Sequence, residues 1–519
     1  MNAQKSQRKV NPWLITCSVM LATFMEVLDT SIANVALRYI AGSLSVSTDE
    51  STWVLTTYLI SNAIIIPSTA WFGQKFGRKR FLIACVGIFT LSSLFCGLAT
   101  SLPMLLLMRV VQGAGGGALQ PIAQTVMLES FPKEKHGQAM GVYGLGVVTA
   151  PILGPVLGGW ITDHFSWRWI FFINVPFGLL AMMMMQRFVH DPPWIRQARP
   201  ARLDVIGFAF MSLWLGAQEV LLDKGQEDDW FGSRFILVMA VAAVIGLGVF
   251  IARGLSAAKP LVDLRVLKNY NFTLGTVLMF FAGVTLYGMT AIVPLFLQSL
   301  MGYTALQSGL TMIPRGLGAL VAMPLAGRVT GKVQARYLVA GGFLAFGLSS
   351  YALTQMTTAI SPWLLFWPLF FSGVSIAFMF VPLNTQALGS LQPGQINNAS
   401  GIFNLMRNVG GSVGITLVTT LAARRAQVHQ NFLVGHATPY DPAWQSRIHG
   451  LTSSFAAHNG AFEGHHQAVG SVYNAVIGQA NLLAYLDDFL YFAVMCLVCI
   501  AGALLLKKTT LHRGPVAIH

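Results

Sequence analysis

Six charged side chains stand inside stretches of sequence that are otherwise apolar enough to cross a membrane. A charge at membrane depth costs at least about 2.5–3.5 kcal/mol, so each is expected to face the interior of a helix bundle or a watery cavity. Such positions are typical of a path for protons or for a substrate. The six residues are Glu26, Asp29, Arg109, Glu219, Arg315 and Arg407.

The acids Glu26 and Asp29 are the leading candidates for proton coupling, with Arg109 as their basic partner. Coupled transport needs a group that binds a proton in one state and gives it up in another, and a buried carboxylate near an arginine meets that need. The two acids are three residues apart, which places them on one helix face, where they are expected to share protons as a coupled pair. The alternative is a hydrogen bond that only packs helices, and it carries more weight for Glu26 than for Asp29.

A second set of polar residues is expected to line a substrate cavity. The arginines in this set either balance the acids or hold an anionic substrate, so lipophilic cations and lipophilic anions both stay open as substrates. The set comprises Glu219, Arg315, Asn404 and Arg407.

The elements that carry these residues are predicted to be transmembrane helices. Of the 519 residues, 54% are hydrophobic and 10% are charged, and the mean hydropathy is +0.61. An ordinary soluble chain carries about 25% charged residues. Fourteen apolar stretches are long enough to cross a hydrocarbon core about 30 Å thick. They run at 14–38, 53–72, 81–101, 104–128, 137–162, 168–187, 205–222, 235–252, 271–297, 304–327, 337–355, 362–385, 399–422 and 486–506.

The placement of the basic residues predicts the orientation. Most of the 33 Lys and Arg residues fall in the loops on the side that holds both termini, and the positive-inside rule places that side in the cytoplasm. The loops lack the interleaved aromatic residues of a nucleic-acid groove, so the net charge of +14 does not indicate nucleic-acid binding. On the opposite side, residues 423–485 form the longest connection, which is either a tolerated insertion or a docking surface.

Three short motifs interrupt this apolar pattern. In residues 150–159, the glycines Gly154, Gly158 and Gly159 stand beside Pro155, which predicts a bent and tightly packed helix segment. A second motif places Gln112, Gly113 and Gly115 after Arg109, and it indicates close helix packing. The third is a basic loop with Gly77, Arg78 and Lys79, which is suited to a tight turn.

Together with the first-helix stretch 28–37, these motifs resemble the major facilitator superfamily, and specifically its fourteen-span drug/proton antiporters of the EmrB/QacA type. The segment 150–159 is similar to a signature of antiporters, and Arg109 to the family's proton-relay arginine. Gln74 stands where the family's basic loop carries an aspartate, so no charge relay through that position is expected.

The resemblance implies an all-α membrane fold with two six-helix halves, 1–188 and 261–519, and a two-helix insertion at 189–260. It also implies proton-coupled export of hydrophobic compounds from a bacterial inner membrane by alternating access. Lipophilic substrates and membrane lipid are the expected partners, and the loop 423–485 favours a periplasmic adaptor with an outer-membrane channel. No nucleotide-binding motif occurs, so neither enzymatic chemistry nor a cofactor is expected. A proton-coupled nutrient importer and a non-transporting receptor or scaffold are the alternatives.

Overall fold

The computed structural model describes residues 11–132, 135–191, 203–258, 260–357, 361–392, 395–436, 438 and 440–507. Nearly all of them are helical, and the β pairing among them is limited to an isolated bridge between Thr330 and Val333. Parts of the predicted insertion, residues 192–202 and 259, lie outside the described residues. The helices are α1 (Pro12–Leu44), α2 (Thr48–Phe76), α3 (Arg78–Gly97), α4 (Leu102–Gly116), α5 (Leu119–Ser130), α6 (His136–His164), α7 (Trp169–Phe172), α8 (Asn174–Phe188), α10 (Val205–Lys224), α11 (Arg234–Ser256), α12 (Tyr270–Ser299), α13 (Ala305–Thr311), α14 (Ile313–Val329), α15 (Ala335–Leu353), α16 (Pro362–Gly389), α17 (Ile396–His436), α18 (Pro442–Asn459) and α19 (Ala461–Leu504).

Within the described ranges, twelve helices or helix pairs are long and apolar enough to cross a membrane. The predicted spans 337–355 and 399–422 fall on α15 and α17, which are helices but are not among these twelve.

Several helices begin at local capping signals. Ser47 and Glu50 form a capping box at α2, and Thr304 and Gln307 form one at α13.

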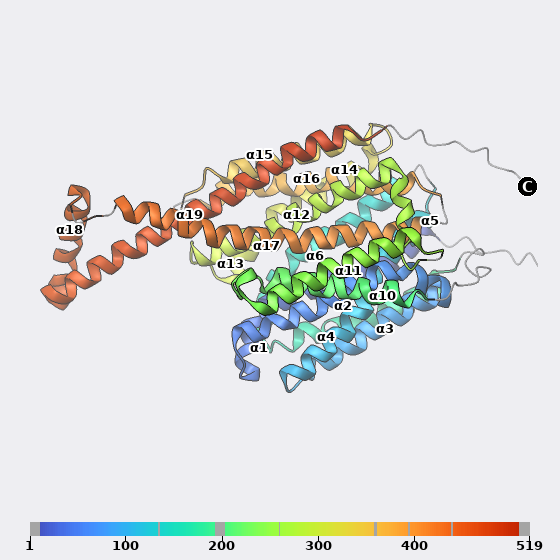
Figure 1. Ribbon diagram of the computed structural model, residues 1–519, viewed down its shortest axis with the longest axis horizontal. Helices are drawn as coiled ribbons and strands as arrows, with labels where there is room; N and C mark the ends of the chain where they lie inside the picture. The colour runs from blue at the N-terminus through green and yellow to red at the C-terminus, as the bar shows by residue number, and fades with distance from the viewer. Residues whose placement is uncertain are drawn as a thin grey trace, which may run out of the picture.

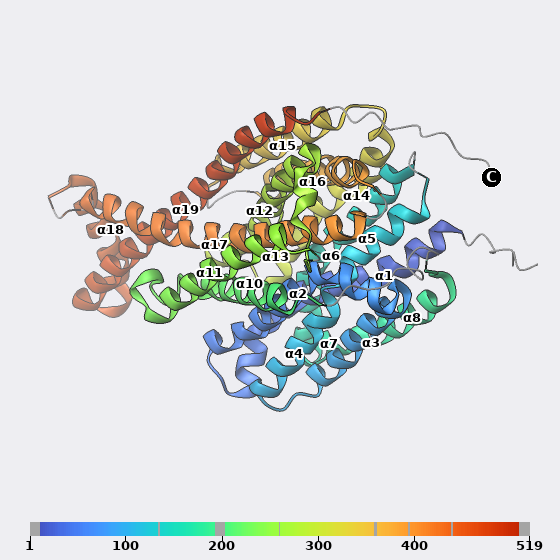
Figure 2. The same cartoon turned by 45° about the vertical axis from the view of Figure 1, so that its right-hand side comes forward.

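The helices pack into two groups, with one hairpin set against both (Figures 1 and 2). Helices α1 to α8 pack on one another, and so do α12 and α14 to α17 with α19. The two groups meet where α6 packs on α13, α14 and α16 and where α17 packs on α2 and α5. The hairpin of α10 and α11 lies beside them, because α10 contacts α2 and α17 as well as α11.

The segment 423–485 is largely helical in its described residues instead of an irregular loop. It comprises the end of α17, all of α18 and the beginning of α19. At 41 and 44 residues, α17 and α19 are about 60 Å long or more, at about 1.5 Å per residue. They therefore extend well beyond one hydrocarbon thickness, and Figure 1 shows α18 far from the bundle at the tip of this extension. We call residues 426–484 the protrusion.

Candidate functional site

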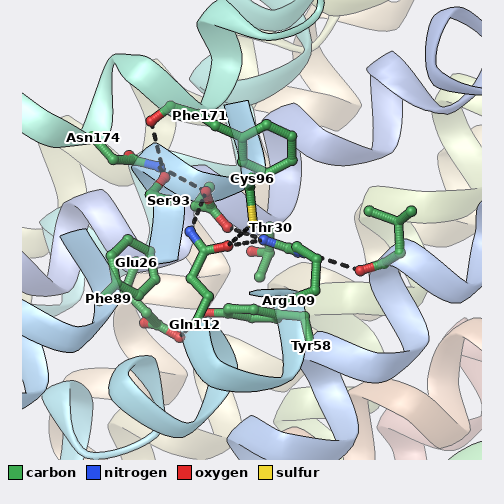
Figure 3. A network of polar contacts seen from close by, with 12 residues as sticks. Glu26, Thr30, Tyr58, Phe89, Ser93, Cys96, Arg109, Gln112, Phe171 and Asn174 are labelled. Atoms are coloured by element: carbon green, nitrogen blue, oxygen red, sulfur yellow. Dashed lines mark hydrogen bonds and ion pairs between the residues drawn. The ribbon is translucent and has the colours of Figure 1, made fainter. Parts of the chain in front are cut away.

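An ion pair between Asp29 and Arg109 is fully buried in the first helix group. Figure 3 shows Arg109 among its neighbours Gln112, Tyr58 and Phe171. The Nη1 atom of Arg109 lies 2.6 Å from Oδ2 of Asp29. The other carboxylate oxygen accepts hydrogen bonds from Gln112 Nε2 at 3.0 Å and from Asn174 Nδ2 at 2.7 Å. Three helices, α1, α4 and α8, thus converge on one carboxylate, which has donors on both of its oxygens.

The arginine of this pair is held on its other sides as well. Its Nε donates to the carbonyl oxygen of Val54 at 3.0 Å, and its Nη1 also donates to Gln112 Oε1 at 2.8 Å. The guanidinium carbon lies 4.2 Å from the ring centroid of Tyr58 and 5.7 Å from that of Phe171. An arginine in this setting has a fixed position, so a change in the charge of Asp29 acts on a rigid partner.

Glu26 lies on the same helix but belongs to a different network. Its Oε1 accepts hydrogen bonds from Asn62 Nδ2 at 3.1 Å and from Tyr58 at 3.3 Å, and its Oε2 accepts one from Gln120 Nε2 at 2.7 Å. Its described hydrogen bonds come from neutral donors, whereas Asp29 has a guanidinium partner. The two acids share a helix, but they bond separate sets of side chains. The two acids therefore have different hydrogen-bond partners.

Gln120 links Glu26 to the second helix group. Its amide nitrogen donates to Glu26, and its amide oxygen accepts a hydrogen bond from Nη2 of Arg407. Arg407 also lies over the ring of Phe380, 5.6 Å from the centroid. The predicted link between acids of one group and an arginine of the other therefore runs through an amide side chain.

A cavity lies between the two groups and the inserted hairpin. It holds about 710 Å³ of free space, part of it open to solvent. Helices α1, α2 and α5 line it from one group, α12 and α17 from the other, and α10 from the hairpin. Two of the lining residues are acids, Glu26 and Glu219, and Tyr58 and Tyr287 contribute rings.

The other predicted cavity residues lie elsewhere. Arg315 is buried with its Nη1 donating to Thr290 and its Nη2 to the carbonyl oxygen of Leu286, 3.0 Å in each case, so it holds α14 against α12. Asn404 donates to Gln124 Oε1 at 2.7 Å. Neither residue lines the cavity, and Arg407 lies next to a lining residue without being one.

Gln124 is the centre of a polar junction between the groups. Its Oε1 accepts hydrogen bonds from Ser400 at 2.6 Å and from Asn404, and its Nε2 donates to Asn384. All four side chains are buried. The junction therefore fastens α5 to α16 and α17, and it would have to open before the two groups could separate at this end.

The glycine and proline motif of α6 packs against α1. A Cβ atom at Gly154 would lie 2.2 Å from Ser31 Oγ, and one at Gly158 would lie 3.2 Å from the carbonyl oxygen of Ile32. At Gly159 a Cβ atom would lie 4.0 Å from Leu306 N, which is an ordinary van der Waals contact. The first two glycines therefore lie in close contact with α1, and at the third a methyl group would be accommodated without overlap.

Pro155 leaves one carbonyl of α6 without its helical donor, and α1 supplies a replacement. A residue at 155 with an N–H would donate to the carbonyl oxygen of Pro151, four residues earlier. Ser31 Oγ donates to that oxygen instead, at 2.9 Å. Ser31 therefore both contacts Gly154 and satisfies the carbonyl that Pro155 exposes.

The basic loop forms a turn that is held by acids from distant segments. Gly77 has a φ of +83°, which favours glycine. The backbone N–H of Lys79 donates to Asp191 Oδ1 at 2.8 Å, and Arg78 forms an ion pair with Glu129. Glu129 and Asp191 thus provide negative charges at this turn, where Gln74 cannot.

Sequence reasoning missed several residues of the site. Tyr58, Asn62 and Gln120 around Glu26, and Ser412 beside Glu219, are uncharged residues without a distinctive spacing. The available signal was the repetition of Asn and Gln within apolar stretches. Among the described residues, no cluster of three or more His, Cys, Asp or Glu side chains could hold a metal ion.

Comparisons with known proteins agree with this architecture. Residues 19–415 match the model of the Major Facilitator Superfamily. The chain is 34% identical over 500 residues to the fatty acid resistance protein FarB of Neisseria gonorrhoeae, covering 96% of this chain and 97% of that protein. It is 36% identical to the multidrug export protein EmrB of Haemophilus influenzae, covering 84% and 85%.

A solved structure supports the fold. The human organic anion transporter MFSD10 superposes with a TM-score of 0.59 at 12% sequence identity, covering 95% of this chain and 99% of that one. At that identity the likeness speaks for the fold alone. The matched residues and the two bacterial relatives carry the assignment: the chain belongs to the Major Facilitator Superfamily, in the branch that holds these relatives.

Proposed function

We propose that this protein exports chemically diverse hydrophobic compounds across a bacterial inner membrane in exchange for protons. The relatives named for multidrug export and for fatty acid resistance support export of lipophilic molecules. The single observation that carries the proton coupling is the buried Asp29–Arg109 pair in the same helix group that supplies Glu26 to the cavity. In this scheme the energy comes from the proton gradient, with no cofactor and no covalent step.

Asp29 is the primary proton site in this proposal. When its carboxylate is charged, Arg109, Gln112 and Asn174 all donate to it, and protonation removes the attraction to Arg109. That change loosens the contact between α1 and α4. Glu26, one helical turn earlier on α1, lines the cavity. Protonation at one position and substrate binding at the other then bias the same helix.

Alternating access would follow from the two helix groups. We propose halves at 1–188 and 261–519 with an insertion at 189–260, and fourteen spans once α15 and α17 are added to the twelve apolar ones. With both termini in the cytoplasm, the Gln124 junction and the contact of Gly137 with Gly327 lie at the cytoplasmic end. Contacts at that end favour a state in which the cavity is closed to the cytoplasm.

The test is transport by the purified protein in proteoliposomes that carry a pH-sensitive dye inside. Addition of a lipophilic substrate should move protons across the membrane in the direction opposite to the substrate, and a protonophore should abolish uphill substrate movement. Protons and substrate moving in the same direction would indicate an importer. The absence of any proton movement across a broad compound panel would indicate a receptor or scaffold.

A further inference from the structure

The inserted helix α10 is attached to both helix groups near its outer end. The hydroxyl of Thr416 on α17 donates to the carbonyl oxygen of Leu222 at 2.9 Å, and Thr56 on α2 donates to Asp223. One turn earlier, Ser412 of α17 bonds the carboxylate of Glu219. These contacts hold α10 across the space between α2 and α17, so it forms one wall of the cavity.

Glu219 has an unusual environment for a carboxylate. Its side chain is buried, with 9% of the residue exposed, and its described hydrogen bonds come from a single hydroxyl, that of Ser412, at 3.0 and 2.9 Å from the two oxygens. One hydroxyl donates one proton, so it satisfies at most part of a carboxylate that can accept about four hydrogen bonds. A charged carboxylate in this place needs a cation beside it.

The cavity supplies no such cation of its own. Its lining contains Glu26 and Glu219, and none of the described lining residues is Lys, Arg or His. Arg407 is not a lining residue, although it donates to Gln120, which is one, and Arg315 donates to Leu286 and Thr290, which do not line the cavity. Glu26 already has the Arg407 guanidinium nearby, bridged to it by Gln120. The basic group that would pair with Glu219 therefore has to come from the ligand.

We infer that Glu219 is a specificity-determining residue that, together with Glu26, selects a substrate carrying a positive charge. This inference rests on the proposed export function and deepens it. A lipophilic cation in the cavity pairs with one of these acids in place of a proton. Tyr58 and Tyr287 supply ring faces that attract a cation within the same cavity.

The other ionisable groups near Glu219 are engaged elsewhere. Asp223 lies one turn further along α10 and accepts from Thr56, and Lys224 pairs with Glu227 at 2.6 Å. The stretch of α17 that lines the cavity is uncharged. Glu26 is thus the one acid that shares the cavity with Glu219 among the described lining residues.

The test compares two ions of nearly the same size and shape and opposite charge, tetraphenylphosphonium and tetraphenylborate. Their binding to the purified full-length protein in detergent is measured by equilibrium dialysis. Glu219→Gln should weaken binding of the phosphonium at least about 10-fold and change binding of the borate by less than about 2-fold. Glu219→Asp should retain most of the phosphonium affinity. A monodisperse size-exclusion profile shows that the variant is folded.

Asp228→Asn is the matched control, because it removes an exposed acid just beyond the C-terminal end of the same helix that does not line the cavity. It should leave phosphonium binding within about 2-fold of wild type. The inference is overturned if Glu219→Gln weakens both ions equally, if it weakens neither, or if wild type prefers the borate. A wild-type protein that transports in proteoliposomes but gives one of these results loses only this inference, and the export function stands.

Discussion

At the scale of single residues, the Asp29–Arg109 pair stabilises the fold and, in the proposed function, couples protons to export. A substitution has to separate these two roles. Removing one partner of a buried ion pair costs about 3–5 kcal/mol, so Asp29→Asn threatens folding as well as coupling. We expect the double variant Asp29→Asn/Arg109→Gln to recover much of the thermal stability, since no uncompensated charge remains, while coupled export stays absent. Thermal unfolding followed by size exclusion and proteoliposome transport measure the two quantities. Restored export in the double variant would remove Asp29 from the proton path.

Glu26→Gln should act more selectively. The amide keeps the shape of the side chain, and its oxygen still accepts from Asn62 and Tyr58. We expect the variant to fold, to keep at least about a third of the export of neutral compounds, and to lose most of the export of cations. The measurement is transport of a neutral and a cationic dye by the same vesicles. Equal loss for both dyes would place Glu26 with Asp29 in the coupling machinery.

The charged residues of the site could be predicted from the sequence, but their partners could not. Charges within apolar stretches are conspicuous, so residue type and position are enough to select Glu26, Asp29 and Arg109. The three-residue spacing suggested that the two acids act as a pair, whereas the structure assigns them different partners. Donors such as Gln112 and Gln120 are set by helix rotation, which a single sequence does not specify.

At the scale of elements, the contact between α1 and α6 depends on a few atoms. A methyl group at Gly154 would overlap Ser31, and overpacking of this kind costs about 1–3 kcal/mol. We predict that Gly154→Ala lowers export at least about 10-fold and reduces thermal stability. Gly159→Ala is the control within the same motif, since its methyl group would make only an ordinary contact, 4.0 Å from Leu306 N. Wild-type export by Gly154→Ala would show that α1 and α6 are free to separate.

The arrangement of the elements was easier to predict than their lengths. Apolar stretches predicted where each membrane helix lies along the chain, because hydrocarbon thickness sets the least length that a span needs. Outside the membrane that constraint is absent, and α17 and α19 continue as helices through residues that looked like a polar loop. Asp441 caps α18 by accepting from the N–H of Ala443 at 2.8 Å, with Pro442 at the first helical position. That start signal was readable in the sequence.

At the scale of the whole molecule, the proposed alternating access requires the two helix groups to separate at the Gln124 junction. Cysteines at Gln124 and Asn404, placed in a background without the five native cysteines, should be joined by a short bifunctional thiol reagent. Because this junction would then stay closed, turnover should stop and should return when a reductant cleaves the link. The single-cysteine variants treated in the same way are the controls. Transport by the cross-linked protein would show that opening at this end is not needed.

The protrusion extends away from the helix bundle and presents exposed apolar side chains there. Its base is clasped by Asp487, whose Oδ2 lies 2.5 Å from Arg425 Nε and 2.9 Å from His429 Nε2. Beyond this clasp, large apolar side chains are exposed on different helices, with Phe432 65% and Phe462 78% accessible. A surface of this kind suits another protein, and we propose a periplasmic adaptor that leads to an outer-membrane channel.

Replacing 431–479 with a Gly/Ser linker removes this surface and keeps the clasp, because Arg425, His429 and Asp487 all remain. We expect vesicle transport to survive, since the cavity and the Asp29–Arg109 pair lie within the bundle. Resistance of whole cells and cross-linking to the adaptor should both be lost. The matched control replaces the two exposed aromatic residues by serine, Phe432→Ser together with Phe462→Ser, and leaves the helices in place. If the shortened protein still confers full resistance, the protrusion is an insertion without a docking role. If vesicle transport is lost together with resistance, the protrusion stabilises the bundle instead.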